Sequence, residues 1–213
     1  MFSLEKLDLI FSKAMSGVPQ GNIGIAVSGG GDSLALLHLS ANWAYKNERK
    51  LKSATVDHGL RADSGSECDY VKKIASELFI EHSTLKWLDK PLGNLQNSAR
   101  DARHRLLRKW QIKKSLSVVL LGHTVDDNAE TILIRISRGS GIDGLVGMSQ
   151  RKNIDNLRIF RPLLTVKRED LREYLSVKGV KWVDEPSNFD ERFQRIKMRK
   201  LLPKLSEVGL SAE

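Results

Sequence analysis

The sequence predicts an α/β fold with a doubly wound, mostly parallel sheet and a C-terminal helical extension. Short apolar runs of strand length alternate with longer helical stretches, which is typical of parallel strands joined by helical crossovers. A three-glycine turn also follows the first apolar run directly. Sheets of this class bind ligands beyond the carboxyl ends of their strands, so the loops at those ends are the predicted site.

The predicted strands lie at residues 23–27, 51–56, 80–85, 117–122 and 158–163, with a short sixth at 180–183. Those at 23–27 and 117–122 are apolar runs of the buried type. The predicted helices lie at residues 33–45, 64–78, 95–114, 126–137 and 165–179, the last capped by Thr165 and ended by Gly179. Residues 1–188 are expected to form one domain. Residues 189–213 are expected to form a basic helical extension, or a linker toward a further C-terminal domain.

The composition is that of an ordinary globular protein, with 40% hydrophobic and 29% charged residues. No apolar run approaches the roughly 20 residues that a membrane-spanning helix needs, and the N-terminus lacks the pattern of a signal peptide. The single cysteine, Cys68, excludes an internal disulfide and any CxxC motif. We therefore expect a cytoplasmic protein without a membrane partner.

The net charge of +9 is concentrated in two clusters. One lies in a predicted helix and comprises Arg100, Arg103, Arg105, Arg108, Lys109, Lys113 and Lys114. The other lies near the C-terminus and comprises Arg192, Arg195, Lys197, Arg199, Lys200 and Lys204. A solvated basic surface is one interpretation. Binding to a polyanion is the other, and clustering favours a nucleic acid.

The segment Ser28-Gly-Gly-Gly-Asp-Ser33 joins the first strand to the first crossover helix. Its glycines allow a tight turn and a close backbone approach to a ligand, and the free amides of the helix N-terminus attract anions. A plain turn seldom needs three glycines. The spacing excludes both a Walker A loop, which needs GxxxxGK, and a GxGxxG dinucleotide loop. The segment is thus predicted to hold phosphate.

Acidic residues beside this loop have two interpretations. Asp32 is explained either as a first-turn acid favoured by the helix dipole or as a ligand of Mg²⁺, which bridges carboxylates to phosphates. Asp126, Asp127 and Glu130 open a later helix, where Asp126 and Glu130 are spaced to share a face. They stabilise that helix, or they form an acidic pocket for Mg²⁺ or an ammonium group.

The form SGGxDS after a first buried strand resembles the PP-loop of ATP pyrophosphatases. Further segments resemble, in order, one branch of that superfamily, the bacterial tRNA(Ile)-lysidine synthases. They are Val56-Asp-His-Gly-Leu-Arg61, Gly122-His-Thr-Val-Asp-Asp-Asn-Ala-Glu-Thr131, Arg138-Gly-Ser-Gly141 with Gly144-Leu145, Arg161-Pro-Leu-Leu164 and Trp182-Val-Asp-Glu-Pro-Ser-Asn188. The resemblance covers residues 21–205 and implies an adenine nucleotide alpha hydrolase-like fold for the domain 1–188.

The resemblance also implies site residues. For ATP they are Ser28, Gly29, Gly30, Gly31, Asp32, Ser33, Val56, His58 and Gly122. For catalysis they are Asp32, His123 and Asp127, with Asp127 and Glu130 for lysine and Asp32 and Asp126 for Mg²⁺. Four arginines are candidates for phosphate or tRNA contact, because guanidinium groups suit phosphate: Arg100, Arg103, Arg138 and Arg161.

The reaction that the resemblance implies adenylates C2 of the wobble cytidine in a CAU anticodon of tRNA(Ile) and releases pyrophosphate. The ε-amine of free L-lysine then displaces AMP. Family members commonly form homodimers, and many continue into C-terminal domains; the segment Arg195-Ile-Lys-Met-Arg199 lacks the family's Arg-Asn pair. The alternatives are a tRNA thiolase, which usually needs several cysteines, and a non-catalytic nucleotide- or RNA-binding module.

Overall fold

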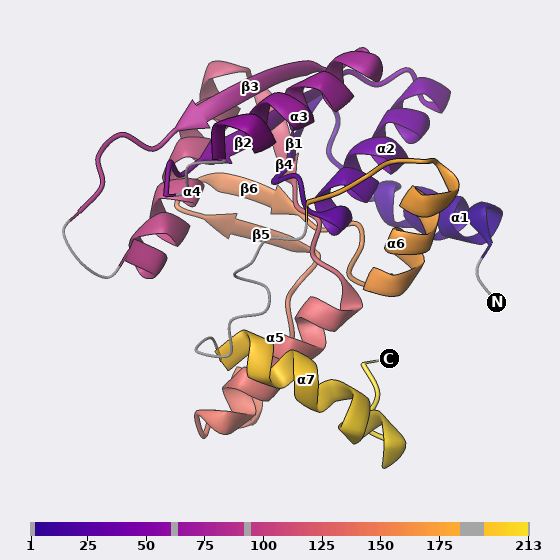
Figure 1. Cartoon of the computed structure of the whole chain (residues 1–213), viewed down its shortest axis with the longest axis vertical. Helices are drawn as coiled ribbons and strands as arrows, with labels where there is room; N and C mark the ends of the chain where they lie inside the picture. Colours follow the sequence, from indigo (N-terminus) through magenta and orange to yellow (C-terminus); the bar gives the residue numbers. More distant parts are fainter. Residues whose placement is uncertain (1–2, 61–63, 92–94, 184–193, 213) are drawn as a thin grey trace.

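The computed structural model describes residues 3–60, 64–91, 95–183 and 194–212. Its centre is a six-stranded sheet in the order β3-β2-β1-β4-β6-β5 (Figure 1). The strands are β1 (Asn22–Ala26), β2 (Leu51–Asp57), β3 (Glu81–Lys86), β4 (Leu116–Leu120), β5 (Arg151–Ile154) and β6 (Leu157–Phe160). All neighbours pair in parallel except β5, which pairs antiparallel with β6. The predicted doubly wound, mostly parallel sheet is therefore confirmed.

Helices cover both faces of the sheet. The structure has α1 (Leu4–Met15), α2 (Gly31–Lys46), α3 (Ser64–Glu77), α4 (Leu95–Lys113), α5 (Val125–Ser137), a 3₁₀ turn η1 (Ile142–Leu145), α6 (Arg168–Val177) and α7 (Gln194–Glu207). The larger core joins one face of the sheet to α1, α2, α3 and α6. The smaller core joins the other face to α4 through Leu107 and Trp110. Gly24 of β1 makes room for the Trp110 ring, since a Cβ there would lie 2.6 Å from it.

Helices α5 and α7 pack on each other beyond the carboxyl ends of the strands, and in Figure 1 this pair projects away from the sheet. Hydrogen bonds link their polar faces: Arg138 and Gln194 join through Nη2 and Oε1, and Gln194 also donates to Ser137. None of the helices in the described part of the chain is long and apolar enough to cross a bilayer.

Some predicted elements need correction. Residues 180–183 are not a strand. The Val183 amide donates to the Gly29 carbonyl at 3.0 Å, and this hydrogen bond ties the segment to the three-glycine loop. Thr165 does not cap α6, whose N-cap is Lys167. The division of the chain at residue 188 lies in the stretch 184–193, outside the described residues, and stays a prediction.

Candidate functional site

The site lies where the strand order reverses. Strands β2 and β4 flank β1 on opposite sides, so the loops after β1 and β4 diverge and open a crevice between them, as sheets of this class do. A pocket of about 550 Å³ occupies this crevice. Its lining comes from the three-glycine loop, the start of α5, and helices α4, α6 and α7: Ala26, Ser28, Gly30, Gly31, Asp32, Ser33, Arg103, Leu121, Gly122, His123, Asp127, Arg168, Arg172, Val183, Arg195, Ile196, Arg199 and Lys200.

The loop after β1 presents backbone amides to the pocket. Gly29 has φ of +90°, a conformation that favours glycine. Gly30 is the N-cap of α2 and provides no side chain to cap it, so the first amides of α2 are left for a ligand. Inside the loop, Ser33 Oγ accepts from the Ser28 amide at 3.1 Å and donates to the Gly30 carbonyl at 2.9 Å. The loop is thus held as an anion cradle at a helix N-terminus.

Gly122 allows the loop after β4 to approach this cradle. A Cβ at Gly122 would lie 3.0 Å from the carbonyl oxygen of Asp32 and 3.3 Å from the Cα of Ser33. Both neighbours are backbone atoms, which cannot rotate away. Glycine at position 122 therefore brings His123 and the start of α5 against the first turn of α2.

Three carboxylates meet beside the cradle, where Arg168 joins Asp32 in the first turn of α2 to Asp127 and Glu130 of α5. Arg168 donates through Nε to Asp32 at 3.1 Å, through Nη2 to Asp127 at 2.9 Å and through Nη1 to Glu130 at 3.3 Å. Glu130 is fully buried and also accepts from α7, from Arg195 Nε at 2.7 Å and Arg199 Nε at 2.8 Å. The pocket wall is therefore a place where acids already hold cationic groups.

Asp32 and Asp127 differ in the direction of their pKa shifts. Burial raises the pKa of Asp32 to about 6, although Arg168 partly opposes the shift. Burial also disfavours the charged form of Asp127, but the guanidiniums of Arg195 and Arg168 outweigh it and lower the pKa of Asp127. The Thr124 amide donates to Asp127 Oδ2 at 2.9 Å and closes a capping box. Asp127 is thus an ionised cation ligand, and Asp32 is the acid whose charge is costly without a further cation.

Asp126 lies apart from these three. Its Oδ2 accepts from the backbone amide of Arg168 at 2.8 Å, and so it caps the start of α6. Its role as a metal ligand stays a prediction. The described residues contain no group of three or more acidic, histidine or cysteine side chains arranged to hold a metal ion. Mg²⁺ often needs only one or two carboxylates besides phosphate oxygens, so Asp32 beside the cradle fits that ion.

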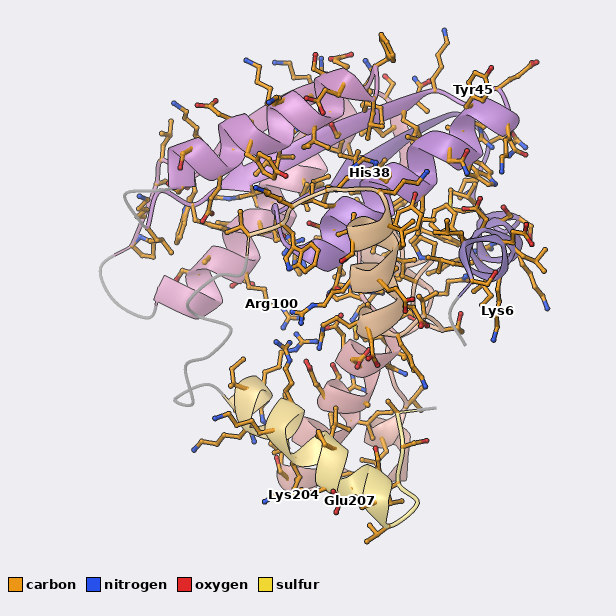
Figure 2. All side chains as sticks on the ribbon, turned by 45° about the vertical axis from the view of Figure 1, so that its right-hand side comes forward. Lys6, His38, Tyr45, Arg100, Lys204 and Glu207 are labelled. Carbon is orange, nitrogen blue, oxygen red and sulfur yellow. The ribbon has the colours of Figure 1, made fainter. Side chains whose placement is uncertain are left out.

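The other predicted residues are distributed as follows. Arg103 lines the pocket, and Arg100 is exposed on the side of α4 that faces the α5–α7 pair (Figure 2). Arg138 binds Gln194 away from the pocket. Val56 packs against the smaller core, and His58 lies edge-on to Trp87 at 5.7 Å. The segment from Asp184 to Asn188, together with Arg61 and Arg192, lies outside the described residues.

Arg161 and His123 form a pair. His123 lines the pocket, while Arg161 is 6% exposed and does not line it. Arg161 Nε donates to His123 Nδ1 at 3.0 Å, and Nη1 donates to the Ser149 carbonyl at 2.8 Å. The predicted contact between Arg161 and phosphate stays a prediction; in this structure the guanidinium lies behind His123.

Sequence reasoning missed Arg168, the residue that joins the acids, and it assigned no role in the site to Arg195 or Arg199. One signal was available for Arg168. It is the first residue of α6, where the positive end of the helix dipole disfavours a cation. A basic residue in that position indicates acidic partners from elsewhere in the fold.

Known proteins that resemble this chain identify its family. Residues 4–205 match the family described as the PP-loop domain. The chain belongs to the PP-loop family. The structure also resembles a U34-tRNA thiolase from Methanococcus maripaludis with a TM-score of 0.82, covering 98% of this chain and 75% of the thiolase. The two are 17% identical, so this likeness shows the PP-loop fold alone.

Curated PP-loop relatives are more similar in sequence. A tRNA(Ile)-lysidine synthase from Ruegeria pomeroyi is 45% identical over 199 residues, which are 93% of this chain and 48% of that protein. One from Wolbachia pipientis is 41% identical over 202 residues, 92% of this chain and 47% of that protein. The chain thus spans about half the length of these relatives.

Proposed function

We propose that this chain forms the PP-loop, ATP-binding catalytic part of a tRNA(Ile)-lysidine synthase, a ligase that forms a carbon–nitrogen bond. Its substrates would be ATP, free L-lysine and the wobble cytidine of a CAU anticodon in tRNA(Ile), and its products lysidine, AMP and pyrophosphate. The observation that carries the proposal is a pocket with one wall for anions and one for cations. The loop of residues 28–33 forms the first wall, and Asp127, backed by the buried Glu130, forms the second.

The anion wall suits the first step. The carbonyl oxygen on C2 of cytidine attacks the α-phosphorus of ATP, the bond to the β-phosphate breaks, and pyrophosphate leaves. The uncapped amides of α2 are preorganised to stabilise the charge that develops on the leaving group. Mg²⁺ held by Asp32 would supply further neutralisation of the phosphates. The raised pKa of Asp32 is consistent with a carboxylate that is completed by a cation.

The cation wall suits the second step. Asp127 and Glu130 hold guanidinium groups from α6 and α7. The same oxygens would orient the lysine ammonium, which has a reference pKa of about 10.4 and must lose a proton before it attacks. The depressed pKa of Asp127 makes it a better ammonium ligand than a base. A phosphate oxygen is then the better acceptor for that proton.

Basic residues around the opening suit tRNA. Both predicted clusters reach the pocket, with Arg103 from α4 and Arg195, Arg199 and Lys200 from α7. Such residues attract phosphates by releasing counterions. We propose that α4 and α7 flank the bound anticodon loop, that the protein works in the cytoplasm and that it forms a homodimer.

The two alternatives are less well supported. A thiolase needs reactive sulfur, but the single cysteine of the chain, Cys68, is buried in α3 away from the pocket, and burial raises the pKa of its thiol. A non-catalytic binding module would have no need to keep Asp127 and Glu130 buried, because burying carboxylates costs free energy.

The test is a lysine-transfer assay. The 213-residue protein is incubated with labelled lysine, ATP, Mg²⁺ and a tRNA(Ile) transcript bearing CAU. We expect label in the RNA, and AMP and pyrophosphate formed in amounts equal to it. A transcript bearing GAU should take up none. Asp127→Asn should abolish transfer, whereas Asp69→Asn, an exposed acid on α3, should leave it unchanged. AMP formation without label in the RNA would reject lysine as the nucleophile.

A further inference from the structure

The side chain of Arg161 is fixed at both ends of its guanidinium. It follows β6 directly and is 6% exposed. Its Nη1 donates to the Ser149 carbonyl at 2.8 Å, and its backbone amide donates to the Gln150 carbonyl at 2.8 Å. These two bonds tie Arg161 to the segment before β5. The hydrogen bond from Nε to His123 Nδ1 at 3.0 Å is therefore made by a group that is already held in place.

That bond determines the tautomer of His123. A guanidinium has donors only and does not lose its proton in proteins. The ring atom facing it must therefore supply a lone pair, so Nδ1 of His123 carries no hydrogen. A neutral imidazole has one hydrogen, and here it is on Nε2. The opposite tautomer would place two N–H groups against each other at 3.0 Å.

The surroundings keep His123 neutral. Burial lowers the pKa of His123 to about 3, and Arg161, Arg103 and Arg195 act in the same direction. Asp127 on α5 is the opposing charge and raises the pKa of His123. These groups come from α4, α5, α7 and the end of β6, the elements packed around the ring. His123 therefore enters the reaction without a charge.

We propose that Arg161 is a positioning residue that locks His123 as its Nε2–H tautomer, so that His123 acts in the pocket as a neutral hydrogen-bond donor and not as a base. The acceptor is a phosphate oxygen of ATP, because Gly122 brings His123 against the first turn of α2, where the anion cradle lies. A neutral imidazole can serve as an electrophile in this way. The identity of the acceptor rests on the proposed function; the tautomer lock does not.

The fixed tautomer also excludes His123 as the acceptor of the lysine proton. A base needs a lone pair facing its substrate, and the lone pair of His123 faces Arg161 instead. Donation from Nε2 is available throughout the neutral pH range, because the ring does not titrate there. The role of His123 is then electrostatic, and its contribution to the rate depends on how well Arg161 holds the ring.

The first experiment reads the tautomer directly. The 213-residue protein is labelled with ¹⁵N-histidine, and the ring signals of His123, one of five histidines, are assigned by their loss in His123→Gln. We expect an unprotonated Nδ1 and a protonated Nε2 from pH 5 to pH 8. Arg161→Met should release the lock, so that both tautomers are populated, while burial still keeps the ring neutral. Arg161→Lys, which restores a donor, should largely recover the wild-type signals.

Arg158→Met is the matched control. Arg158 lies on β6, the strand that Arg161 follows, and also donates to a backbone carbonyl, that of Leu116, at a site away from His123. Its signals should equal those of the wild type. A wild-type His123 with its hydrogen on Nδ1, a ring that titrates near 6.5, or an Arg161→Met spectrum identical to the wild type would each overturn the proposal. The wild-type result decides even if Arg161→Met does not fold.

The second experiment follows AMP release against pH. Removing a well-placed donor to developing charge costs about 100- to 1,000-fold in rate, so misplacing one should cost Arg161→Met roughly 10- to 100-fold in kcat. The profile should stay flat near the unperturbed histidine pKa of about 6.5, because burial still keeps the ring neutral, and the kcat of Arg161→Lys should be intermediate. If the wild type shows the lock but transfers no lysine, the proposed function fails and the lock stands. If it transfers lysine while Nδ1 carries the hydrogen, the reverse holds.

Discussion

Replacing Glu130 by glutamine tests how the pocket wall is held together. Glu130 is completely buried and accepts from Arg168 at 3.3 Å, Arg195 at 2.7 Å and Arg199 at 2.8 Å. Glutamine has nearly the same shape, but its charge is gone and half of its amide is a donor. Arg195 and Arg199 would then lose their principal partner. Among the described residues, Arg195 would keep an ion pair with Asp127, and Arg168 would keep Asp32 and Asp127.

The expected loss of stability follows from burial. Removing one partner from a buried ion pair costs about 3–5 kcal/mol, because the other charge is left uncompensated. The side chains of Arg195 and Arg199 are 40% and 32% exposed, so water can reach them after the change, whereas that of Arg168 is 14% exposed. We therefore expect the free energy of unfolding to fall by about 3 kcal/mol, the lower end of that range.

Glu81→Gln is the matched control. Glu81 also binds two cations, Lys52 and Lys114, and its pKa is lowered to about 2 by the hydrogen bonds from these lysines. Its side chain is nevertheless 47% exposed, and exposed pairs contribute about 0.2–1 kcal/mol. The same number of charges is removed in both variants, so the difference between them measures burial.

Urea denaturation measures both free energies, and amide hydrogen exchange locates the change. In Glu130→Gln the amides of α7 should lose protection before those of the sheet, because Arg195 and Arg199 anchor α7 to α5 through Glu130. Equal stability losses in the two variants, or unchanged protection of α7, would refute the idea that Glu130 holds this helix in place.

Three further predictions concern single positions. As pH rises from about 4 to about 6, wild-type stability should fall relative to Asp32→Asn by about 2–3 kcal/mol, because the folded state binds the Asp32 proton more tightly than the unfolded chain does; denaturation at several pH values measures this. Gly122→Ala should lose about 1–3 kcal/mol and bind ATP more weakly, since its Cβ meets the Asp32 backbone. Gly141→Ala, where a Cβ meets nothing within 4 Å, should change neither. Asp126→Ala should lose about 1 kcal/mol with the cap of α6, while the Mg²⁺ concentration for half-maximal AMP release stays constant; a rise would restore Asp126 as a metal ligand.

The parts of the fold that the sequence predicted are those with a strong local pattern. The strands at 23–27 and 117–122 are apolar runs, and each matches an observed strand within two residues at either end. Strand β5 was missed because its residues, Arg151 to Ile154, are mostly polar and exposed. The signal for it lay in the turn: Asp155 and Asn156 have φ of +47° and +67°, as tight hairpins require.

Helix α1 was missed for a different reason. Its apolar residues Leu7, Phe11 and Met15 recur every four positions and are buried, which is a helical pattern, but charged residues such as Glu5, Lys6 and Asp8 lie between them. The short strand expected at 180–183 was wrong because Trp182 and Val183 pack over the three-glycine loop instead of joining the sheet. Local propensity does not contain that contact.

In the site, motifs found the residues that meet at strand ends, and they failed for residues whose role depends on a partner from another element. Arg168 was missed because its three carboxylates come from α2 and α5. Arg161 was assigned to phosphate because the chemistry of a guanidinium is visible in the sequence, whereas its burial behind His123 is not. Pairing in three dimensions defines the contacts of Arg168, whereas a contact of Arg161 with phosphate stays a prediction.

The charge balance of the pocket has a consequence for substrate binding. Asp127 and Glu130 already bind Arg195 and Arg199 from α7. An ammonium group that binds these carboxylates would compete with the two arginines or would bind beside them. Both arginines are about a third exposed or more, and they can turn toward phosphates at little cost in solvation. A cation bound at the carboxylates would replace the two arginines there, and a polyanion at α7 would replace the carboxylates as the partner of the arginines. Each binding event would then favour the other.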